Sequence, residues 1–440
     1  MTAATLPFPR PASAALPRLL AGLCWQQVTS LPEHERRYGA LWLRGPSGRR
    51  RPGRLIEIVD AAGLTGRGGA GFPTGRKMRS VAGRGETVVV ANGAEGEPAS
   101  SKDRLLLTQL PHLVLDGITL AADAVGATEA HLCLHGREQA LMDGLAAAVT
   151  ERRAAGLDPV PVKITGIPGR YVSSEQSSIV QYLNGGAGMP TFSPPRTHER
   201  GVAGRPTLVN NVETLAHVAL IARYGDGWFR SAGLPSAPGT ALVTVGGAVW
   251  RPGVYEIELG TSAGEVVMLA GGPTEDLQAL LIGGYSGTWL PVEVAWPVPM
   301  AQASLRAVGA GLGAGILIAM PDSSCGLAET ARVIRYLADE SAGQCGPCLM
   351  GLPALASALA DLAFHGGREG AASAAAALIP LIEGRGACRH PDGAARLADS
   401  AMQAFAADAC WHDQHGPCSG VRRAPLLPIP GDEERDWDWT

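Results

Sequence analysis

The sequence predicts an α/β protein in which a domain built on a parallel sheet is followed by a small mixed sheet and a C-terminal helical bundle. In the first half of the chain, continuous apolar runs alternate with helical patterns, which is typical of strands joined by crossover helices. Short strand-like runs with glycine at their turns follow, and from Cys325 onward the apolar spacing is helical. The 440 residues provide for about three domains of ordinary size.

The composition excludes some functions before any motif is considered. With 37 Lys and Arg residues against 41 Asp and Glu residues, the net charge of -4 argues against a protein that binds nucleic acid through a basic surface. The 58 glycines and 33 prolines indicate many tight turns and close backbone approaches. Only three lysines occur, at 77, 102 and 163, so each of them stands out.

Residues 1–50 are rich in Pro and Arg and predict an extended arm, with a short helix in the apolar segment Leu16–Trp25. Prolines and Arg18 interrupt the apolar stretch near the N-terminus, which argues against a signal peptide. The longest apolar run, Ala307–Met320, is shorter than the roughly 18 residues that cross a bilayer, so it predicts a buried strand rather than a membrane span. We therefore expect a cytoplasmic protein without a direct membrane span.

Residues 51–235 form the first predicted domain. Leu55–Ala62 has helical spacing, and Glu86–Asn92 is a continuous apolar run, the pattern of a strand buried on both faces. The other predicted elements are a helix at Leu105–Val125, a strand at His131–His135, a helix at Arg137–Arg153 and a strand at Val160–Ile167.

A glycine-rich loop follows the first helix of this domain. It spells G-x-G-x-x-G from Gly66, but a helix precedes it and Pro73 follows it, whereas a dinucleotide fingerprint follows a strand and opens a helix. Clustered backbone N–H groups and basic side chains predict a phosphate cradle of another design, with a plain surface turn as the alternative. The residues concerned are Gly66, Arg67, Gly68, Gly69, Gly71, Gly75, Arg76 and Lys77.

An acidic loop follows the strand that ends at Asn92. Glu95, Glu97 and Lys102 would then lie at the carboxyl end of a parallel strand, where ligands of such sheets bind. Two carboxylates in a Gly-flanked loop suit hydrogen bonds to ribose hydroxyls and to a carboxamide, while a solvated acidic turn is the alternative.

The rest of the chain predicts two further units and a tail. Residues 238–322 contain short strand patterns around one helical pattern, which predicts a small mixed sheet of the β-grasp type, or else an extension of the first sheet. Residues 325–415 contain four helical patterns with short joints, which predicts a small bundle. Residues 420–440 are rich in Pro and acidic residues, so we expect a disordered tail.

Four motifs together resemble a known family. They are TGRGGAGFPTGRK, the N-x-x-E-x-E-P-x-x-x-K-D-R run from Asn92, the Y-x-x-x-E run from Tyr171, and LVNNVETLAH. This set resembles the flavin-binding 51-kilodalton subunit of the NADH dehydrogenase of respiratory complex I, whose relatives serve NAD-linked hydrogenases and formate dehydrogenases. The resemblance covers residues 50–405 and implies a flavin- and NADH-binding α/β domain, an SLBB-like β-grasp domain and a helical iron–sulfur domain.

The resemblance also implies roles for individual residues. Glu95 and Glu97 would lie where nicotinamide stacks on the flavin, and we expect them to position and tune rather than to transfer protons. Glu175 and Gln176 would lie in the NADH site. The FMN and its phosphate would contact Gly66, Arg67, Gly68, Gly69, Gly71, Lys77, Asn92, Asn210, Asn211 and Thr214.

The chain departs from the family pattern at several of these places. Gln176 replaces a glutamate, which should weaken repulsion of a 2′-phosphate and so reduce discrimination between NADH and NADPH. Ala94 replaces an aspartate, Gly96 replaces a serine, and Ser174 replaces a glycine. We expect these changes to affect the nucleotide site and to leave the flavin site intact.

The cysteines of the last domain depart from the pattern as well. The family has a C-x2-C-x2-C run and a distant fourth cysteine, whereas Cys345, Cys348 and Cys388 match three of these and Ala342 stands in the first place. Thiolates at this spacing predict a 4Fe–4S cluster, with a three-iron cluster, a zinc site or no metal as alternatives. The fourth ligand is open; the candidates are Ser341, Cys325, His390, Cys410 and Cys418.

The function implied by the resemblance is that of an NAD(P)H dehydrogenase. Such a flavoprotein would oxidise NAD(P)H through FMN and pass single electrons through the cluster to a partner. A ferredoxin, a thioredoxin-like two-iron subunit or a membrane reductase could receive them. The alternative is a non-catalytic ligand-binding module of a redox complex with a degenerate or absent cluster.

Overall fold

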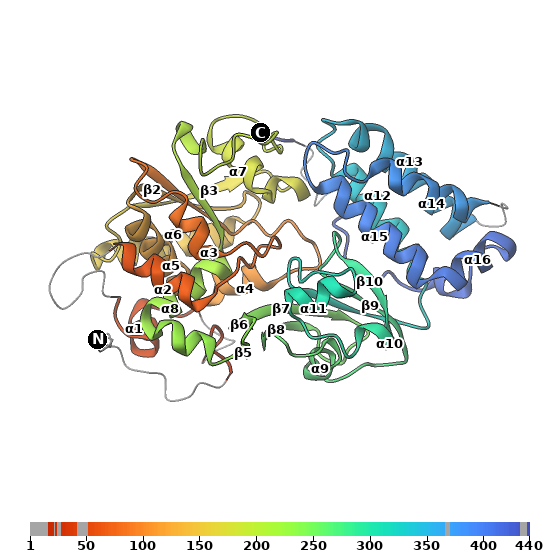
Figure 1. The fold of residues 1–440 in the computed structure, drawn as a ribbon, viewed down its shortest axis with the longest axis horizontal. Helices are drawn as coiled ribbons and strands as arrows, with labels where there is room; N and C mark the ends of the chain where they lie inside the picture. Colours follow the sequence, from red (N-terminus) through yellow and green to blue (C-terminus); the bar gives the residue numbers. More distant parts are fainter. Residues whose placement is uncertain (1–15, 22, 24–27, 42–51, 366–369, 432–437) are drawn as a thin grey trace.

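The computed structural model describes residues 16–21, 23, 28–41, 52–365, 370–431 and 438–440. Figure 1 shows three units: an α/β domain in red to yellow-green, a second sheet in green, and a helical bundle in blue that lies beside both. The mixed α/β class, the separate second sheet and the helical C-terminus are as predicted.

The first sheet is parallel and has the order β3-β2-β1-β4. Its central strand β1 is fully buried from Val88 to Ala91, as its unbroken apolar run predicted. The helices α2, α5 and α8 pack against one another, and their apolar residues form one core with this sheet. The strands are β1 (Thr87–Asn92), β2 (Ala127–His135), β3 (Val162–Ile167) and β4 (Thr207–Asn211); the helices are α2 (Pro52–Ala62), α3 (Thr74–Arg79), α4 (Lys102–Gln109), α5 (Pro111–Val125), α6 (Gln139–Ala154), α7 (Gln176–Leu183) and α8 (Val212–Arg230).

The single helix expected at Leu105–Val125 is wrong, because the structure breaks it at Leu110. The helices α4 and α5 meet there at an angle of 96°. Pro111 has no N–H to donate and disfavours helical geometry at the residue before it, and Leu110 accordingly has φ -131° and ψ 46°. The break turns the start of α4 back toward the carboxyl edge of the sheet.

The helix expected at Leu16–Trp25 is also wrong in the part that the structure describes, because residues 18–21 form a turn there. Residues 22, 24 and 25 lie outside the described residues. The Glu256 carboxylate binds this turn through the backbone N–H groups of Arg18, Leu19 and Leu20. The N-terminal helix is instead α1 (Leu31–Tyr38), which His34 ties to the buried Asp116 at 2.7 Å.

The second sheet is mixed and has the order β10-β9-β11-β7-β8, which excludes an extension of the first sheet. Only β11 and β7 pair in parallel among its strands. Only the last five residues of the run that was expected to be a buried strand lie in β11, whose six residues are all buried. The elements of this unit are β7 (Thr240–Gly247), β8 (Gly253–Glu258), α9 (Ala263–Leu269), β9 (Leu277–Ile282), β10 (Thr288–Pro291), α10 (Val292–Ala295), α11 (Gln302–Ala307) and β11 (Ile316–Pro321), after a small hairpin of β5 (Gly233–Leu234) and β6 (Ala237–Pro238).

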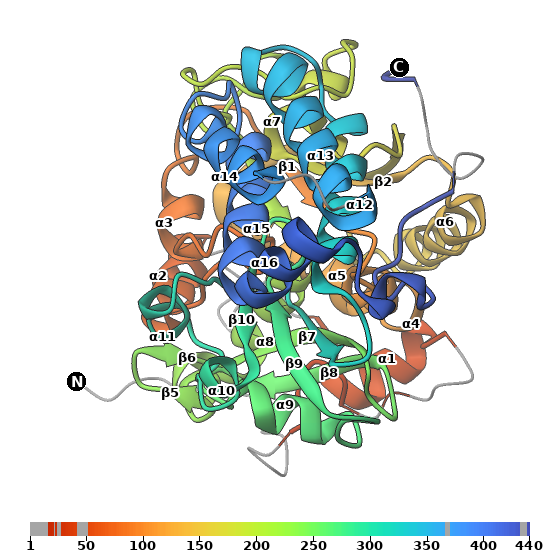
Figure 2. The same cartoon turned by 90° about the vertical axis from the view of Figure 1, so that its right-hand side faces the viewer.

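Among the residues that the structure describes, the bundle has five α-helices where four were expected. The last predicted helix is divided at Phe405, whose ring packs so closely on Gly326 that a Cβ there would clash with it. Figure 2 shows these helices above the strands of the second sheet. They are α12 (Gly326–Asp339), α13 (Leu352–Ala360), α14 (Ala371–Ile382), α15 (His390–Ala404) and α16 (Ala406–His415).

One helical run of the described residues, Pro347–His365, is long and apolar enough to span a membrane by length and composition. It contains α13 with a π-helical turn at each end. Its Leu352, Leu355 and Leu359 side chains are buried against α12 and α14, so one face of this run packs in the core of the bundle.

Part of the tail that was expected to be disordered packs against the protein. Leu427 is 1% exposed, and its N–H and that of Leu426 donate to the Glu329 carboxylate. Near the C-terminus, Trp439 lies under the Arg170 guanidinium at 4.2 Å. Apolar residues in this Pro-rich segment complete the bundle core, which its composition did not indicate.

Candidate functional site

The glycine loop joins α2 to α3 and lies between the first and second sheets. Gly69 pairs with Gly313 of the second unit, and together they border a cavity of about 70 Å³. A Cβ on Gly68 would lie 3.1 Å from the Asn211 Cβ, so a larger residue there would push the loop off the sheet edge. The loop therefore presents its backbone where the two units meet.

The Arg67 residue lines this cavity, but its guanidinium points into the protein. Its guanidinium donates to the Thr240 carbonyl at 3.0 Å and to Thr65, and it is 4% exposed. Burial lowers the pKa of Arg67, and nearby Glu213 opposes this effect. Its backbone N–H donates to Thr214 Oγ1 at 2.9 Å, so Arg67 and Thr214 fasten the loop to α8 and β7.

Three asparagines lie at the carboxyl edge of the first sheet, because β1 and β4 end side by side. Asn92 pairs in register with Asn211, and its amide donates to the Ser174 carbonyl at 2.8 Å. Asn211 caps α8 and donates to Asp103 at 2.6 Å. Asn210 is buried, and its Nδ2 finds no hydrogen-bond acceptor among the described residues. A buried donor without a partner at this edge fits a bound polar ligand.

Glu95 folds back onto the start of α4. Its carboxylate accepts the N–H groups of Asp103 and Arg104, both at 3.1 Å, and the Ser100 hydroxyl. It therefore holds the acidic loop in place, which the spacing of the two glutamates did not reveal.

Glu97 is buried where the first domain meets the second unit. Its Oε2 accepts from the Tyr171 hydroxyl and from the Tyr285 N–H, both at 3.1 Å, while its Oε1 finds no partner among the described residues. Burial raises the pKa of Glu97 to about 8, so its carboxyl group is mostly protonated near neutral pH. Neither tyrosine was among the residues expected at the site, although Tyr171 begins one of its motifs.

Gly96 lies directly against Tyr171 and Ser174. A Cβ added to Gly96 would clash with Ser174 Oγ and would lie 2.7 Å from the Tyr171 carbonyl oxygen. A side chain at position 96 would therefore require the Tyr171–Ser174 segment to move. The acidic loop keeps its close approach to Tyr171–Ser174.

A buried ionic cluster lies next to Asn211. The sequence did not predict that these charged residues form a cluster. Lys102 Nζ lies 2.7 Å from Asp103 and 3.0 Å from Glu213. Burial alone would raise the pKa of Glu213, but Lys102 holds it at about 2. The signal that could have found this cluster is the rarity of lysine, since Lys102 is one of only three.

Lys77, Glu175 and Gln176 meet at the start of α7. Glu175 caps this helix through the N–H groups of Ser177 and Ser178. Lys77 donates to Gln176 Oε1 at 2.9 Å, and Gln176 Nε2 donates to Thr197 Oγ1 at 2.5 Å. Burial lowers the pKa of Lys77 to about 8, against the opposing charge of Glu175. The structure thus places Lys77 beside Gln176, and not on the border of the glycine-loop cavity.

The three cysteines lie together at the end of the bundle nearest the first domain. Burial raises the pKa of Cys348 to about 12, neighbouring Cys345 and Cys388 add to this, and a hydrogen bond with Ser341 opposes it. Of the candidates for a fourth ligand, Ser341 therefore touches this group. Cys325 and Cys418 lie instead with His412, and His390 Nε2 bonds the Leu337 carbonyl at 2.8 Å.

A short segment connects Glu97 with the cysteine domain. Arg170 forms an ion pair with Glu340 at 2.9 Å, and Glu340 also accepts the Tyr171 N–H. The Tyr171 ring lies 5.5 Å from the His390 ring, two residues after Cys388. This segment fixes the first domain to the bundle between the two candidate cofactor sites.

Comparisons with known proteins agree with this arrangement. Family models match the Nuo51 FMN-binding domain over residues 59–220, the SLBB domain over 242–284, and the NADH-ubiquinone oxidoreductase-F iron-sulfur binding region over 328–412. A crystal structure of an NAD+-reducing NiFe hydrogenase in the H2-reduced state is similar with a TM-score of 0.80 at 30% identity, covering 91% of this chain and 67% of that one.

Curated relatives include both kinds of complex. The chain is 32% identical over 391 residues to the second F-type subunit of the NADH-quinone oxidoreductase of Rhizobium meliloti (strain 1021), covering 86% of this chain and 92% of that protein. It is 34% identical over 314 residues to the alpha subunit of the NAD-reducing hydrogenase HoxS of Cupriavidus necator, covering 68% of this chain and 51% of that protein.

The fold and the matches define a subunit of NADH-linked oxidoreductases. Such a subunit has a flavin domain, an SLBB domain and an iron–sulfur region. The chain belongs to the family of F-type NADH-quinone oxidoreductase subunits, which confirms the resemblance inferred from its motifs.

Proposed function

We propose that this chain oxidises NADH at bound FMN and passes electrons singly through an iron–sulfur cluster to a redox partner. The observation that carries the proposal is a pair of buried polar atoms without partners among the described residues, Glu97 Oε1 and Asn210 Nδ2, in loops and strand ends beside the glycine loop. FMN can accept a hydride from a stacked nicotinamide and release electrons one at a time.

The residues of the chain bind and orient in this proposal. Backbone N–H groups of the loop from Gly66 to Gly71 would hold the FMN phosphate, and Asn210 would donate its free amide to the cofactor. Glu97, held by Tyr171 and Tyr285, would present a protonated carboxyl group to the nicotinamide side. Exclusion of water by the second unit would keep these contacts strong.

The three cysteine thiolates would hold the 4Fe–4S cluster, with the Ser341 oxygen at the fourth iron. The hydrogen bond between Ser341 and Cys348 supports this choice. Leu349 and Met350, next to Cys348, are 61% and 74% exposed. They would give a thioredoxin-like two-iron subunit, a ferredoxin or a membrane reductase an apolar contact beside the cluster in the cytoplasm.

Reduction of a one-electron acceptor tests this proposal. The chain loaded with FMN should reduce ferricyanide with NADH, and FMN-free chain should not. A loaded chain that leaves ferricyanide oxidised would contradict the proposal and favour a non-catalytic binding module.

Replacing Glu97 with glutamine should flatten the pH dependence of stability in the cofactor-free protein. Since burial raises the pKa of Glu97 from 4.5 to about 8, the folded chain keeps a proton that the unfolded chain releases. The contribution of this group is fully present below about pH 4.5 and is lost as the pH rises toward about 8. As the pH rises between these limits, the free energy of unfolding of the wild type should fall. That of Glu97→Gln should fall by roughly 2–4 kcal/mol less.

Urea unfolding at about pH 5 and about pH 8 measures this difference. The exposed Glu293→Gln is the matched control and should behave as the wild type does. Equal losses in wild type and Glu97→Gln would show that Glu97 does not hold a proton in the folded chain.

Replacing Gln176 with glutamate should raise the preference for NADH over NADPH. Gln176 lacks the negative charge that a glutamate would have at the place proposed for the ribose. The positively charged Lys77 Nζ lies 2.9 Å from Gln176 Oε1. A carboxylate there should repel a 2′-phosphate, although Lys77 reduces its effect, so we expect a change in the kcat/KM ratio of up to about tenfold. Gln181→Glu, further along α7, is the control, and an unchanged ratio in Gln176→Glu would place Gln176 outside the nucleotide site.

A further inference from the structure

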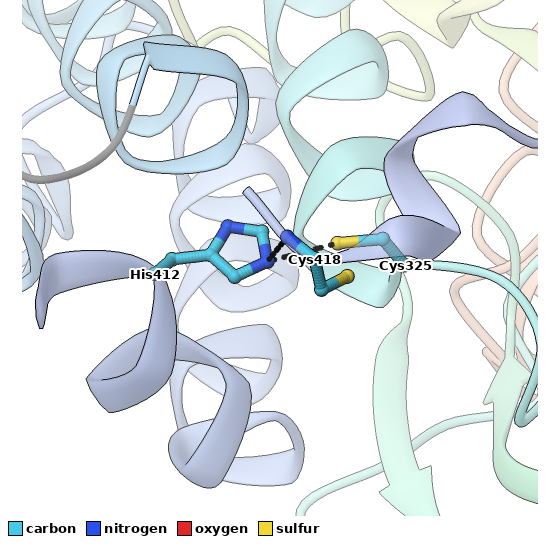
Figure 3. Close-up of side chains that lie close together, drawn as sticks. All are labelled: Cys325, His412 and Cys418. Carbon is cyan, nitrogen blue, oxygen red and sulfur yellow. Dashed lines mark hydrogen bonds between the residues drawn. The ribbon is translucent and has the colours of Figure 1, made fainter. Parts of the chain in front are cut away.

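A second group of possible metal ligands lies at the far end of the bundle from the three cysteines of the cluster region. Cys325 is the residue before α12, His412 lies in the last helix α16, and Cys418 precedes the final short turn. Their ligand atoms all lie within 4.8 Å of one another. Figure 3 shows the three side chains pointing toward one another. Three chain segments thus bring two sulfurs and one imidazole to a single point.

The tautomer of His412 follows from two of its hydrogen bonds, one at each ring nitrogen. The Cys418 backbone N–H can only donate, and it lies 3.1 Å from His412 Nε2, so this nitrogen carries a lone pair. His412 Nδ1 lies 3.2 Å from the Leu362 carbonyl oxygen and therefore carries the hydrogen. A histidine that donates Nδ1–H to a carbonyl and offers Nε2 is oriented as metal-binding histidines are.

The spacing and the burial also fit a metal. Cys325 Sγ lies 3.8 Å from His412 Nε2, close to the roughly 3.5–3.8 Å between ligands that tetrahedral zinc imposes with its bond lengths of about 2.0–2.3 Å. Cys325 is 2% exposed and His412 is fully buried, while Cys418 is partly exposed. Two thiolates and an imidazole are a ligand set that zinc prefers.

We propose that Cys325, His412 and Cys418 bind one zinc ion, separate from the iron–sulfur region, with a water completing the tetrahedron at the partly exposed Cys418. The ion would take the His412 lone pair that now accepts the Cys418 N–H. It fastens the start of α12 to the end of α16 and to the segment that follows.

The segment that follows Cys418 links the proposed zinc site to the packing of the C-terminal part of the chain. A few residues after Cys418, Leu427 enters the bundle core and the Pro428 carbonyl accepts the Tyr285 hydroxyl. Because Cys418 anchors this segment, loss of the metal should loosen the C-terminal part of the chain without touching Cys345, Cys348 or Cys388. A chelator should therefore lower the melting temperature of the zinc-loaded protein.

Metal content tests the proposal on the full chain. The background is the Cys345→Ala, Cys348→Ala and Cys388→Ala variant, so that no metal can bind in the cluster region. Purified from zinc-containing medium and desalted, it should retain about one zinc ion per chain. Adding Cys418→Ser or His412→Ala should lower this at least fivefold, whereas adding the exposed Cys410→Ser should leave it unchanged.

Cobalt provides a readout that does not depend on the folding of the ligand variants. Co²⁺ added to the metal-free background chain should produce the thiolate charge-transfer and tetrahedral visible bands, and zinc should displace them. Absence of these bands, equal zinc content with Cys418→Ser, or a Cys325–Cys418 disulfide in the freshly reduced and desalted protein would overturn the proposal.

Discussion

Gly68→Val should weaken FMN binding by at least about 100-fold, because the added side chain would displace the glycine loop from the sheet edge. A Cβ alone would lie 3.1 Å from Asn211 Cβ, and valine adds two methyl groups beyond it. The displaced loop could no longer aim its N–H groups at a phosphate while Asn211 keeps its cap on α8. Equilibrium dialysis against FMN measures the change.

Gly144→Val is the matched control, since a Cβ there meets nothing within 4 Å on helix α6. It should bind FMN as the wild type does, and both variants should keep the unfolding midpoint of the bundle. Stoichiometric FMN in Gly68→Val after dialysis would show that the loop is not the cofactor cradle.

Replacing any one of Cys345, Cys348 or Cys388 with alanine should remove iron and acid-labile sulfide from anaerobically purified protein. Three thiolates are already one fewer than a 4Fe–4S cluster usually has, so loss of another leaves too few ligands. Ser341→Ala should retain less iron than the wild type and more than the cysteine variants. Iron and sulfide analysis of protein from a cluster-competent host measures both.

Two comparisons separate the cluster from general damage. The exposed Cys410→Ala should keep the iron of the wild type. The cysteine variants should keep FMN and its reduction by NADH, since the flavin site lies in the first domain. Iron-free wild-type protein would contradict the cluster and favour thiols that remain without a metal.

Local signals predicted most of the fold. The apolar run of β1, the glycine-bounded strands of the second sheet and the helical spacing after Cys325 each record a burial pattern, and the structure confirms all three. Pro111 is the local signal for the break at Leu110, and the helical spacing around it concealed that break. The packing of Leu427 depends on partners far away in the chain, which composition cannot show.

The sequence indicated which loops belong to the candidate site, and it did not indicate how their side chains contact one another. The motifs pointed to the loops that contain Gly66 and Glu97, but only the fold reveals that Tyr171 and Tyr285 bind Glu97. The inward direction of Arg67 and the joining of Cys325 with His412 likewise come from tertiary packing. Neither leaves a spacing pattern in the sequence.

Anaerobic addition of NADH to the purified, FMN-reconstituted chain tests the central claim most directly. We expect a flavin absorption near about 450 nm that bleaches on addition of NADH, and Gly68→Val protein should show no bound flavin to bleach. Protein that stays colourless after reconstitution, or bound flavin that NADH leaves oxidised, would contradict the proposed NADH-oxidising function.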